Sequence, residues 1–381
     1  MPTNCFGDEE LSYLREVIES QVAWRWGKRN FVPRFEQAFG EHLGRTYVHA
    51  VNSGTNANLT AYASLGLAPG DEVICPGYAP IFVSFPIIAI GCIPVFADVD
   101  PRTQIITAES IEERITPRTR AIVVVHLNGQ PAQMDEILAL AERHRLRVVE
   151  DCAQAYDAVY KGKKVGTLGD IACFSMQQSK HITSGEGGMI ATDNPELYKR
   201  ACEYANSGMP WYMYDLPRPE ALPVDGLPTR GHFSFGLDFR FSELQAAVAL
   251  AQLEKIDRFN ARRRELVATI ERELAGLPGV RLAHVYPDTR PNYWLYPVRG
   301  PEHLGCRGEL NYLEVEYQRM QQTRHTSVGM PLPDYVQYHA GICPLAEASL
   351  KGAWSFFVHH STTDEELAGA IRSFTDLVRA G

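Results

Sequence analysis

The chain has 381 residues, a formal charge of -9 at pH 7 and a sequence pI near 5.8. A single hydrophobic core stops growing at about 250 to 300 residues, so this length predicts a large domain and a smaller one. Acidic and basic residues are spread along the chain without a Lys/Arg block that could follow a phosphate backbone, which argues against a nucleic-acid partner.

The N-terminal segment and the cysteines exclude further classes of protein. The first residues are acidic and polar, whereas a signal peptide begins with basic residues and continues into an apolar core. No run approaches the roughly 18 apolar residues of a membrane helix. The eight cysteines are far apart and form no Cys-x-x-Cys motif, so we expect reduced core cysteines and no metal site. The sequence therefore predicts a soluble, cytoplasmic protein without a membrane partner.

Between about residues 45 and 195, short apolar runs alternate with amphipathic stretches, a pattern typical of a parallel sheet wrapped by helices. Most of the runs are apolar on both faces, as buried parallel strands must be. We expect strands at 47–51, 71–76, 93–99, 120–127, 146–151, 170–175 and 187–192. Helical spacing predicts helices at 53–66 and 131–145. The fold class is therefore α/β with a mostly parallel central sheet between helices.

The rest of the chain has a different pattern. Residues 207–235 are rich in Pro, Gly and aromatic residues and predict a long loop, which in a compact domain is usually functional or disordered. Residues 241–277 predict one helix, long enough to bridge two domains. We therefore expect an N-terminal arm and large domain over residues 1–260, and a small α+β domain over residues 261–381.

The first chemical motif is the strand-to-helix turn in VNSGTNAN. Ser53, Gly54 and Thr55 lie where free backbone N–H groups, the helix dipole and two hydroxyls suit a phosphate dianion. An ordinary helix N-cap explains the same residues equally well.

The second motif, VVEDCAQAYDAVY, puts Asp151 at the end of a buried strand. Burial of a carboxylate is costly unless a cation or hydrogen-bond donors meet it, and a protonated pyridine nitrogen is one such partner. A salt bridge or an N-cap is the alternative. Gln154 follows about one helical turn later, where it can reach a phenolic oxygen on the same ring.

The third motif, DIACFSMQQSKHITSGEGGMIAT, puts Lys180 in a polar, Gly-rich turn between two apolar strands, five residues after Ser175. Desolvation and nearby positive charge lower the pKa of an amine, as a lysine that forms a Schiff base requires. The alternative is a surface lysine on a hairpin. The glycines of SGEGG favour the buried position because they indicate close backbone packing.

A phosphate turn, a buried aspartate and a lysine at a strand end are together what a pyridoxal 5'-phosphate site needs. The motifs SGT, EDCAQAY, FSMQQSK and SGEGG, followed by GLDFRFSELQAAVALAQL, resemble the DegT/DnrJ/EryC1/StrS sugar aminotransferases of the fold type I, aspartate aminotransferase-like superfamily. The resemblance covers about residues 10–260. QQSK and AWRWGKRNFVPRFEQAF are most similar to members that aminate keto-cyclitols in aminoglycoside pathways.

The resemblance implies roles for individual residues. Lys180 is implied to be the Schiff-base lysine and proton carrier, and Asp151 to hold the pyridine N–H. The other residues implied to bind the cofactor are Ser53, Gly54, Thr55, Tyr78, Gln154, Ser175 and Asp238. The family is a homodimer with shared sites, so residues 207–240 are implied to serve the partner's site.

Two departures from the family pattern concern the cofactor site. Pro80 stands where the family usually has the aromatic residue that stacks on the pyridine ring, and Tyr78 or Phe82 could replace it. Asp238 stands where the phosphate motif of the partner subunit usually has Asn. Since a carboxylate repels a phosphate, we expect Asp238 to be protonated, turned away or paired with Arg240.

The resemblance implies an aminotransferase that moves an amino group from glutamate or glutamine to a keto-sugar, nucleotide-linked or not, or to a keto-cyclitol, in amino-sugar or antibiotic biosynthesis. A dehydratase, a cyclase or an amino-acid-modifying enzyme with the same fold and cofactor is the alternative. A non-catalytic regulator that binds the cofactor is a third hypothesis. Dehydratases of this family have histidine in place of the lysine, and here Lys180 is retained beside His181.

Overall fold

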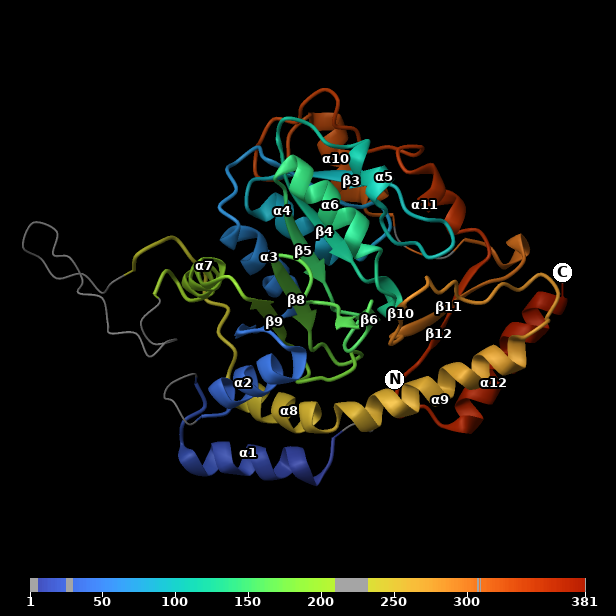
Figure 1. The fold of residues 1–381 in the computed structure, drawn as a ribbon, viewed down its shortest axis with the longest axis horizontal. Helices are drawn as coiled ribbons and strands as arrows, with labels where there is room; N and C mark the ends of the chain where they lie inside the picture. Colours follow the sequence, from blue (N-terminus) through green and yellow to red (C-terminus); the bar gives the residue numbers. More distant parts are fainter. Residues whose placement is uncertain (1–5, 25–29, 210–231, 307, 309, 381) are drawn as a thin grey trace, which may run out of the picture.

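The computed structural model describes residues 6–24, 30–209, 232–306, 308 and 310–380. Its centre is a seven-stranded sheet of order β1-β9-β8-β5-β4-β2-β3 (Figure 1). The strands are β1 Tyr47–Val51, β2 Glu72–Pro76, β3 Ile93–Ala97, β4 Thr119–Val125, β5 Arg147–Asp151, β8 Ile171–Ser175 and β9 Gly188–Thr192. Neighbouring strands are parallel, except that β9 is antiparallel to β1 and β8. All seven predicted strands are confirmed.

Helices cover both faces of this sheet (Figure 1). Helix α3, Gly54–Ser64, packs against β8 and β9, and α6, Met134–His144, packs against β5. Both helices were predicted, because their apolar residues recur at helical spacing. Other helices around the large sheet are α1 Asp8–Ser20, α2 Phe31–Leu43, α4 Phe85–Ala89, α5 Ala108–Glu112 and α7 Pro195–Ala205. The α/β class is therefore confirmed.

The helix predicted over residues 241–277 is two helices, α8 Glu243–Glu254 and α9 Ile256–Leu274, so the prediction of one continuous helix was wrong. The two meet at Lys255, whose amine binds the buried carboxylate of Glu10 on α1. This contact lies at the junction where the chain passes from α8, which packs on α1 and α2, into α9. In Figure 1, α8 and α9 follow one another across the lower part of the molecule, with α8 above α1, toward α12, Asp364–Arg379.

The buried apolar residues form two clusters. The first fills the space around the central sheet, and residues from 310 to 346 also pack on it. The second joins α9 and α12 to a small antiparallel sheet, β11 Leu295–Arg299 and β12 Ala353–Phe357. The remaining elements are β6 Val159–Tyr160, β7 Lys163–Lys164, β10 Thr289–Arg290, α10 Val315–Thr323 and α11 Pro344–Ser349. The division into residues 1–260 and 261–381 stays a prediction.

Three other expectations concern single segments. The loop predicted at 207–235 lies mostly outside the described residues. Among the described cysteines, only Cys306 is exposed, which corrects the expectation of core cysteines at that position. In the described part of the chain, no helix is both long and apolar enough to cross a bilayer.

Candidate active site

The carboxyl ends of β5 and β8 and the start of α3 meet at one edge of the sheet. The side-chain amide of Asn58, on α3, donates a 2.9 Å hydrogen bond to Asp151 at the end of β5. A Cβ atom on Gly54 would lie 2.6 Å from the Cβ of Ser175, at the end of β8. The structure therefore brings together the phosphate turn, Asp151 and Ser175, which are far apart in the sequence.

The turn before α3 has the geometry of an anion site. Ser53 is the N-cap residue, and its hydroxyl accepts a hydrogen bond from the N–H of Asn56 at 3.1 Å, so the N-cap interpretation holds for this side chain. The N–H groups at the very start of the helix have no acceptor within α3, as at any helix N-terminus. A Cβ on Gly188 would lie 2.2 Å from the carbonyl oxygen of Ser53. Close backbone packing at SGEGG is thereby confirmed.

Asp151 is a buried carboxylate, with 5% of its surface exposed. It accepts hydrogen bonds from Asn58 and from the N–H of Ala153, each at 2.9 Å. No Lys, Arg or His nitrogen of the described residues lies within 4.0 Å of it, so the salt-bridge alternative is not realised there. A buried anion with donors but no cation suits a positively charged ligand group. Asn58 was missed in the sequence, although it lies one helical turn after Gly54.

Lys180 lies in the turn after β8, partly buried against Trp294. Its amine is 3.9 Å from the centre of the indole ring. Desolvation lowers the pKa of Lys180 to about 8, with Asp151 opposing this shift and Arg263 adding to it. The alternative of an ordinary surface lysine is therefore excluded by its surroundings.

Two residues that the sequence motifs did not indicate hold the Lys180 turn. Arg263 on α9 is buried and donates hydrogen bonds to the backbone carbonyls of Lys180 and Tyr293, both at 3.4 Å, and of Val358. The indole N–H of Trp294 donates to the carbonyl of Ser179 at 2.7 Å. Both residues come from beyond position 260, and no short-range pattern could have linked them to the lysine.

Gln154 is also buried at this edge of the sheet. Its side-chain oxygen accepts a 2.6 Å hydrogen bond from the N–H of Asn128, whose carbonyl in turn accepts from the N–H of Trp294 at 3.0 Å. The side-chain NH2 of Gln154 makes no hydrogen bond with the described residues. The amide orientation therefore leaves a donor for a ligand oxygen.

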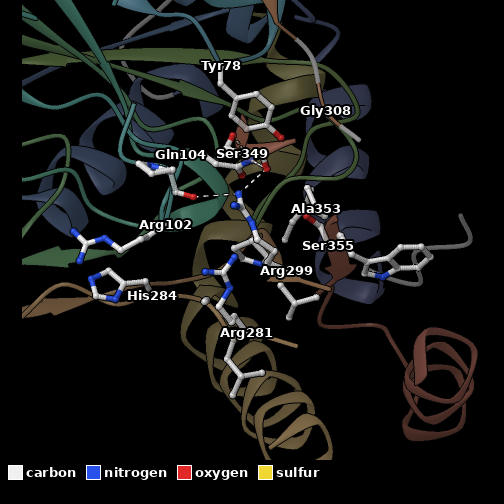
Figure 2. Close-up of a pocket in the computed structure, with 17 residues that line it drawn as sticks. Tyr78, Arg102, Gln104, Arg281, His284, Arg299, Gly308, Ser349, Ala353 and Ser355 are labelled. Carbon is white, nitrogen blue, oxygen red and sulfur yellow. Dashed lines mark hydrogen bonds between the residues drawn. The ribbon is translucent and has the colours of Figure 1, made fainter. Parts of the chain in front are cut away.

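The residues at the departures from the family pattern have contacts of their own. Tyr78 lines a cavity of about 670 Å³ whose lining does not include Lys180, Asp151 or Gly54 (Figure 2). The role of Tyr78 at the cofactor stays a prediction. The carbonyl of Phe82 accepts from Asn58 at 3.3 Å, although 59% of Phe82 is exposed. The side-chain amide of Asn58 therefore links the backbone of Phe82 to Asp151.

Asp238 forms a 2.8 Å ion pair with Arg240, one of the three arrangements expected for this carboxylate. The guanidinium Nε of Arg240 also donates to Asn206 at 2.8 Å. The negative charge at position 238 is thus compensated within the chain itself. Its repulsion of a nearby phosphate is reduced accordingly.

A buried group of His126, Glu150 and Cys152 lies beneath Asp151 with metal-like spacing. Glu150 accepts hydrogen bonds from His126 at 3.0 Å and from three backbone N–H groups. Burial opposes ionisation, but these bonds hold the pKa of Glu150 below its usual value. His126 Nδ1 accepts from the N–H of Ala132. Because these atoms are already used, the group supports the strand ends and offers no open ligand set.

A profile of the DegT/DnrJ/EryC1/StrS aminotransferase family matches residues 4–375. The chain belongs to this family. GDP-perosamine synthase of Caulobacter vibrioides is 34% identical to this aminotransferase over 375 residues, 97% of this chain and 95% of that protein. L-glutamine:2-deoxy-scyllo-inosose aminotransferase of Micromonospora echinospora is 38% identical over 274 residues, 70% of this chain and 63% of that protein.

A solved aminotransferase from Psychrobacter cryohalolentis matches the fold with a TM-score of 0.86 and 28% identity, covering 100% of this chain and 99% of that one. The aminotransferase thus has the fold type I architecture expected from the sequence. As in its family, the cofactor is pyridoxal 5'-phosphate.

The residues at the sheet edge fit this cofactor. The Gly54–Ser175 contact leaves no room for a Cβ at position 54, so a phosphate held at this turn would meet backbone without an intervening side chain at Gly54. Asp151 offers a buried anion for the protonated ring nitrogen, and Lys180 offers an amine with a lowered pKa. These three features correspond to the phosphate, the ring nitrogen and the aldehyde of the cofactor.

Proposed function

We propose that this aminotransferase moves an amino group from glutamate or glutamine to the keto group of a sugar or cyclitol, in amino-sugar or antibiotic biosynthesis. The acceptor class is supported by the names of two relatives, GDP-perosamine synthase and L-glutamine:2-deoxy-scyllo-inosose aminotransferase. The second name also supports glutamine as the donor. The observation that carries the proposal is the Lys180 amine beside Trp294, with its pKa lowered, at the edge that holds Asp151.

Asp151 and Lys180 have complementary roles in this proposal. The bound cofactor supplies an electron sink for the carbanion formed next to the transferred nitrogen. Asp151 keeps the ring nitrogen protonated, because a buried carboxylate is stabilised by a cation at hydrogen-bond distance. Lys180 would attach the cofactor covalently, and its free amine would hold and move the proton at the substrate carbon. A pKa near 8 suits this work, since the amine can both accept and donate a proton near neutral pH.

The remaining site residues orient the cofactor. Ser53, Gly54, Thr55 and Ser175 hold its phosphate, and the side-chain NH2 of Gln154 donates to the ring oxygen. Tyr78 is proposed to contact the ring, and Asp238 with Arg240 to serve the phosphate of the neighbouring site. The protein is proposed to act in the cytoplasm as a homodimer in which residues 207–240 complete the partner's site.

The test is a visible absorption spectrum of the holoenzyme, recorded beside Lys180→Ala, with glutamate, glutamine and alanine added in turn. We expect a band of the lysine-bound cofactor that is absent from the variant and is bleached by the true donor. Borohydride reduction followed by mass spectrometry should place the cofactor on the peptide that contains Lys180.

The outcomes separate the alternatives. A band that no donor bleaches would leave the cofactor site in place and redirect the chemistry to elimination, cyclisation or amino-acid modification. The same band and reduced adduct in Lys180→Ala as in the wild type would contradict the role of Lys180. A wild-type protein that retains no cofactor after reconstitution would overturn the proposal as a whole.

A further inference from the structure

The cavity lined by Tyr78 lies between the small sheet and the loops that follow β2 and β3 (Figure 2). One of its walls is a face of that sheet. There the backbone of Arg299 is the bridge partner of Arg281 on one side and of Ala353 on the other. Side chains directly opposite one another lie on the same face, and this face repeats every second residue. The other wall residues at this spacing are Ala283, Leu295, Pro297 and Ser355. Because Ala283, Pro297 and Ser355 are small, the face leaves open volume beside the two arginines.

The two arginines form an unusual pair. Their backbones exchange hydrogen bonds of 2.7 and 2.9 Å, so the side chains start side by side on one face. Like charges directly opposite in a sheet destabilise it. Within the described residues, Arg299 Nη2 donates only to the carbonyls of Pro101, at 3.2 Å, and Ser349, at 2.7 Å. Burial and the charge of Arg281 lower the pKa of Arg299.

No carboxylate compensates this pair in the described part of the chain, since neither arginine forms an ion pair there. A third cavity residue, Arg102, is already neutralised by Asp100 at 2.6 Å. The hydroxyl of Tyr286 binds the same carboxylate at 2.7 Å. The excess positive charge of the cavity therefore comes from Arg281 and Arg299, and no carboxylate of the described residues balances it.

We propose that this cavity binds a phosphate-bearing ligand through Arg281 and Arg299. Planar guanidinium groups match phosphate oxygens with paired hydrogen bonds, and two adjacent arginines suit a dianion or a diphosphate. A volume of about 670 Å³ is within the range of small-molecule sites and leaves room for more than the phosphate itself. The ligand resolves the charge repulsion that the folded chain alone leaves in place.

The position of the cavity allows two sources for this ligand. In the sheet order, β2, which leads to Tyr78, is two strands from β5, which ends at Asp151. At about 4.8 Å per strand, the ends of these two strands are roughly 10 Å apart. The phosphate can therefore belong to the amino acceptor, or to a separate phosphate compound. The inference goes beyond the proposed function, because it does not depend on the transfer reaction.

The experiment is calorimetric titration of the holoenzyme with inorganic pyrophosphate and, separately, with guanosine diphosphate. Arg281→Gln removes one charge from an exposed side chain and leaves the carbonyl contacts of Arg299 intact. Arg299→Gln is the second variant. Arg290→Gln is the matched control, since Arg290 is exposed on β10 and lies outside the cavity lining.

We expect Arg281→Gln and Arg299→Gln each to weaken pyrophosphate binding about tenfold or more, the loss typical of one charge-assisted hydrogen bond. Added salt should weaken the wild-type binding more than that of either variant. Tighter binding of guanosine diphosphate than of pyrophosphate would assign the cavity to a nucleotide-linked ligand, and equal binding would assign it to a simple phosphate compound. Undetectable binding by the wild type, or equal affinities for the wild type, Arg281→Gln and Arg290→Gln, would overturn the proposal. Since no turnover is measured, failure here is distinct from failure of the donor reaction.

Discussion

At the scale of single residues, the chemistry of the site depends on groups whose charge is expensive to bury. Asp151 is buried with hydrogen-bond donors but without a cation among the described residues, and Lys180 has its pKa lowered to about 8. Burying each charged group costs free energy because the group loses contact with water. A bound cofactor that interacts with both groups offsets this cost. This arrangement explains why both side chains are placed at strand ends, where the ligand can reach them.

The lowered pKa of Lys180 predicts how fast the apoprotein captures its cofactor. Only the neutral amine attacks the aldehyde, so the rate should rise with pH and level off above a midpoint near about 8, well below the usual 10.5. Stopped-flow absorbance after addition of pyridoxal 5'-phosphate measures this profile. Asp151→Asn should move the midpoint lower still, because Asp151 raises the pKa. A wild-type midpoint close to 10.5 would contradict the structure.

At the scale of elements, the site is made where α3 crosses the ends of β5 and β8. The helix begins directly after β1, so its free N–H groups point at the carboxyl edge of the sheet. The antiparallel strand β9 then passes so close to Ser53 that only glycine fits at position 188. The phosphate turn is thus formed by packing between elements as well as by its own sequence.

Gly54→Ala tests this packing. Its new Cβ would lie 2.6 Å from the Cβ of Ser175, so the start of α3 must move away from β8. We expect cofactor affinity to fall by at least about tenfold, equivalent to ~1.4 kcal/mol. Fluorescence titration of the apoprotein with pyridoxal 5'-phosphate measures it.

Gly369→Ala is the matched control for that substitution. Gly369 lies inside α12, where a Cβ meets nothing closer than Arg372 at 3.9 Å. Alanine should therefore stabilise the protein by about 0.5–1 kcal/mol and leave cofactor affinity unchanged. Equal cofactor affinity in Gly54→Ala and Gly369→Ala would show that the close contact does not shape the phosphate turn.

At the scale of the whole molecule, the Lys180 turn is held from both hydrophobic clusters. Arg263 on α9 reaches the carbonyl of Lys180, and Trp294 covers the amine. Residues 292 to 294 also bind the loop after β4 through Asn128 and Gly129. Movement of the small sheet relative to the large one would therefore change the surroundings of the lysine directly.

The proposed homodimer makes a prediction at this scale. If residues 207–240 complete the partner's site, Lys180→Ala and Arg240→Ala should each be inactive, whereas their mixture should regain activity. After subunit exchange, about half of the dimers are mixed and each has one intact site, so about a quarter of wild-type activity is expected. Transamination assays before and after exchange measure it. An inactive mixture that contains mixed dimers would place Lys180 and Arg240 in the same subunit's site.

The sequence by itself determined the sheet and the order of the chemical groups along it. Strands buried on both faces are apolar throughout, and this local pattern located all seven, together with the turn at Gly54, Asp151 and Lys180. Tertiary structure alone decided which distant residues complete the site. Asn58, Arg263 and Trp294 act through contacts across the fold, and the break between α8 and α9 falls at Lys255, which contacts α1. The Arg281–Arg299 pair likewise exists only because two distant segments become neighbours in space, which no local pattern encodes.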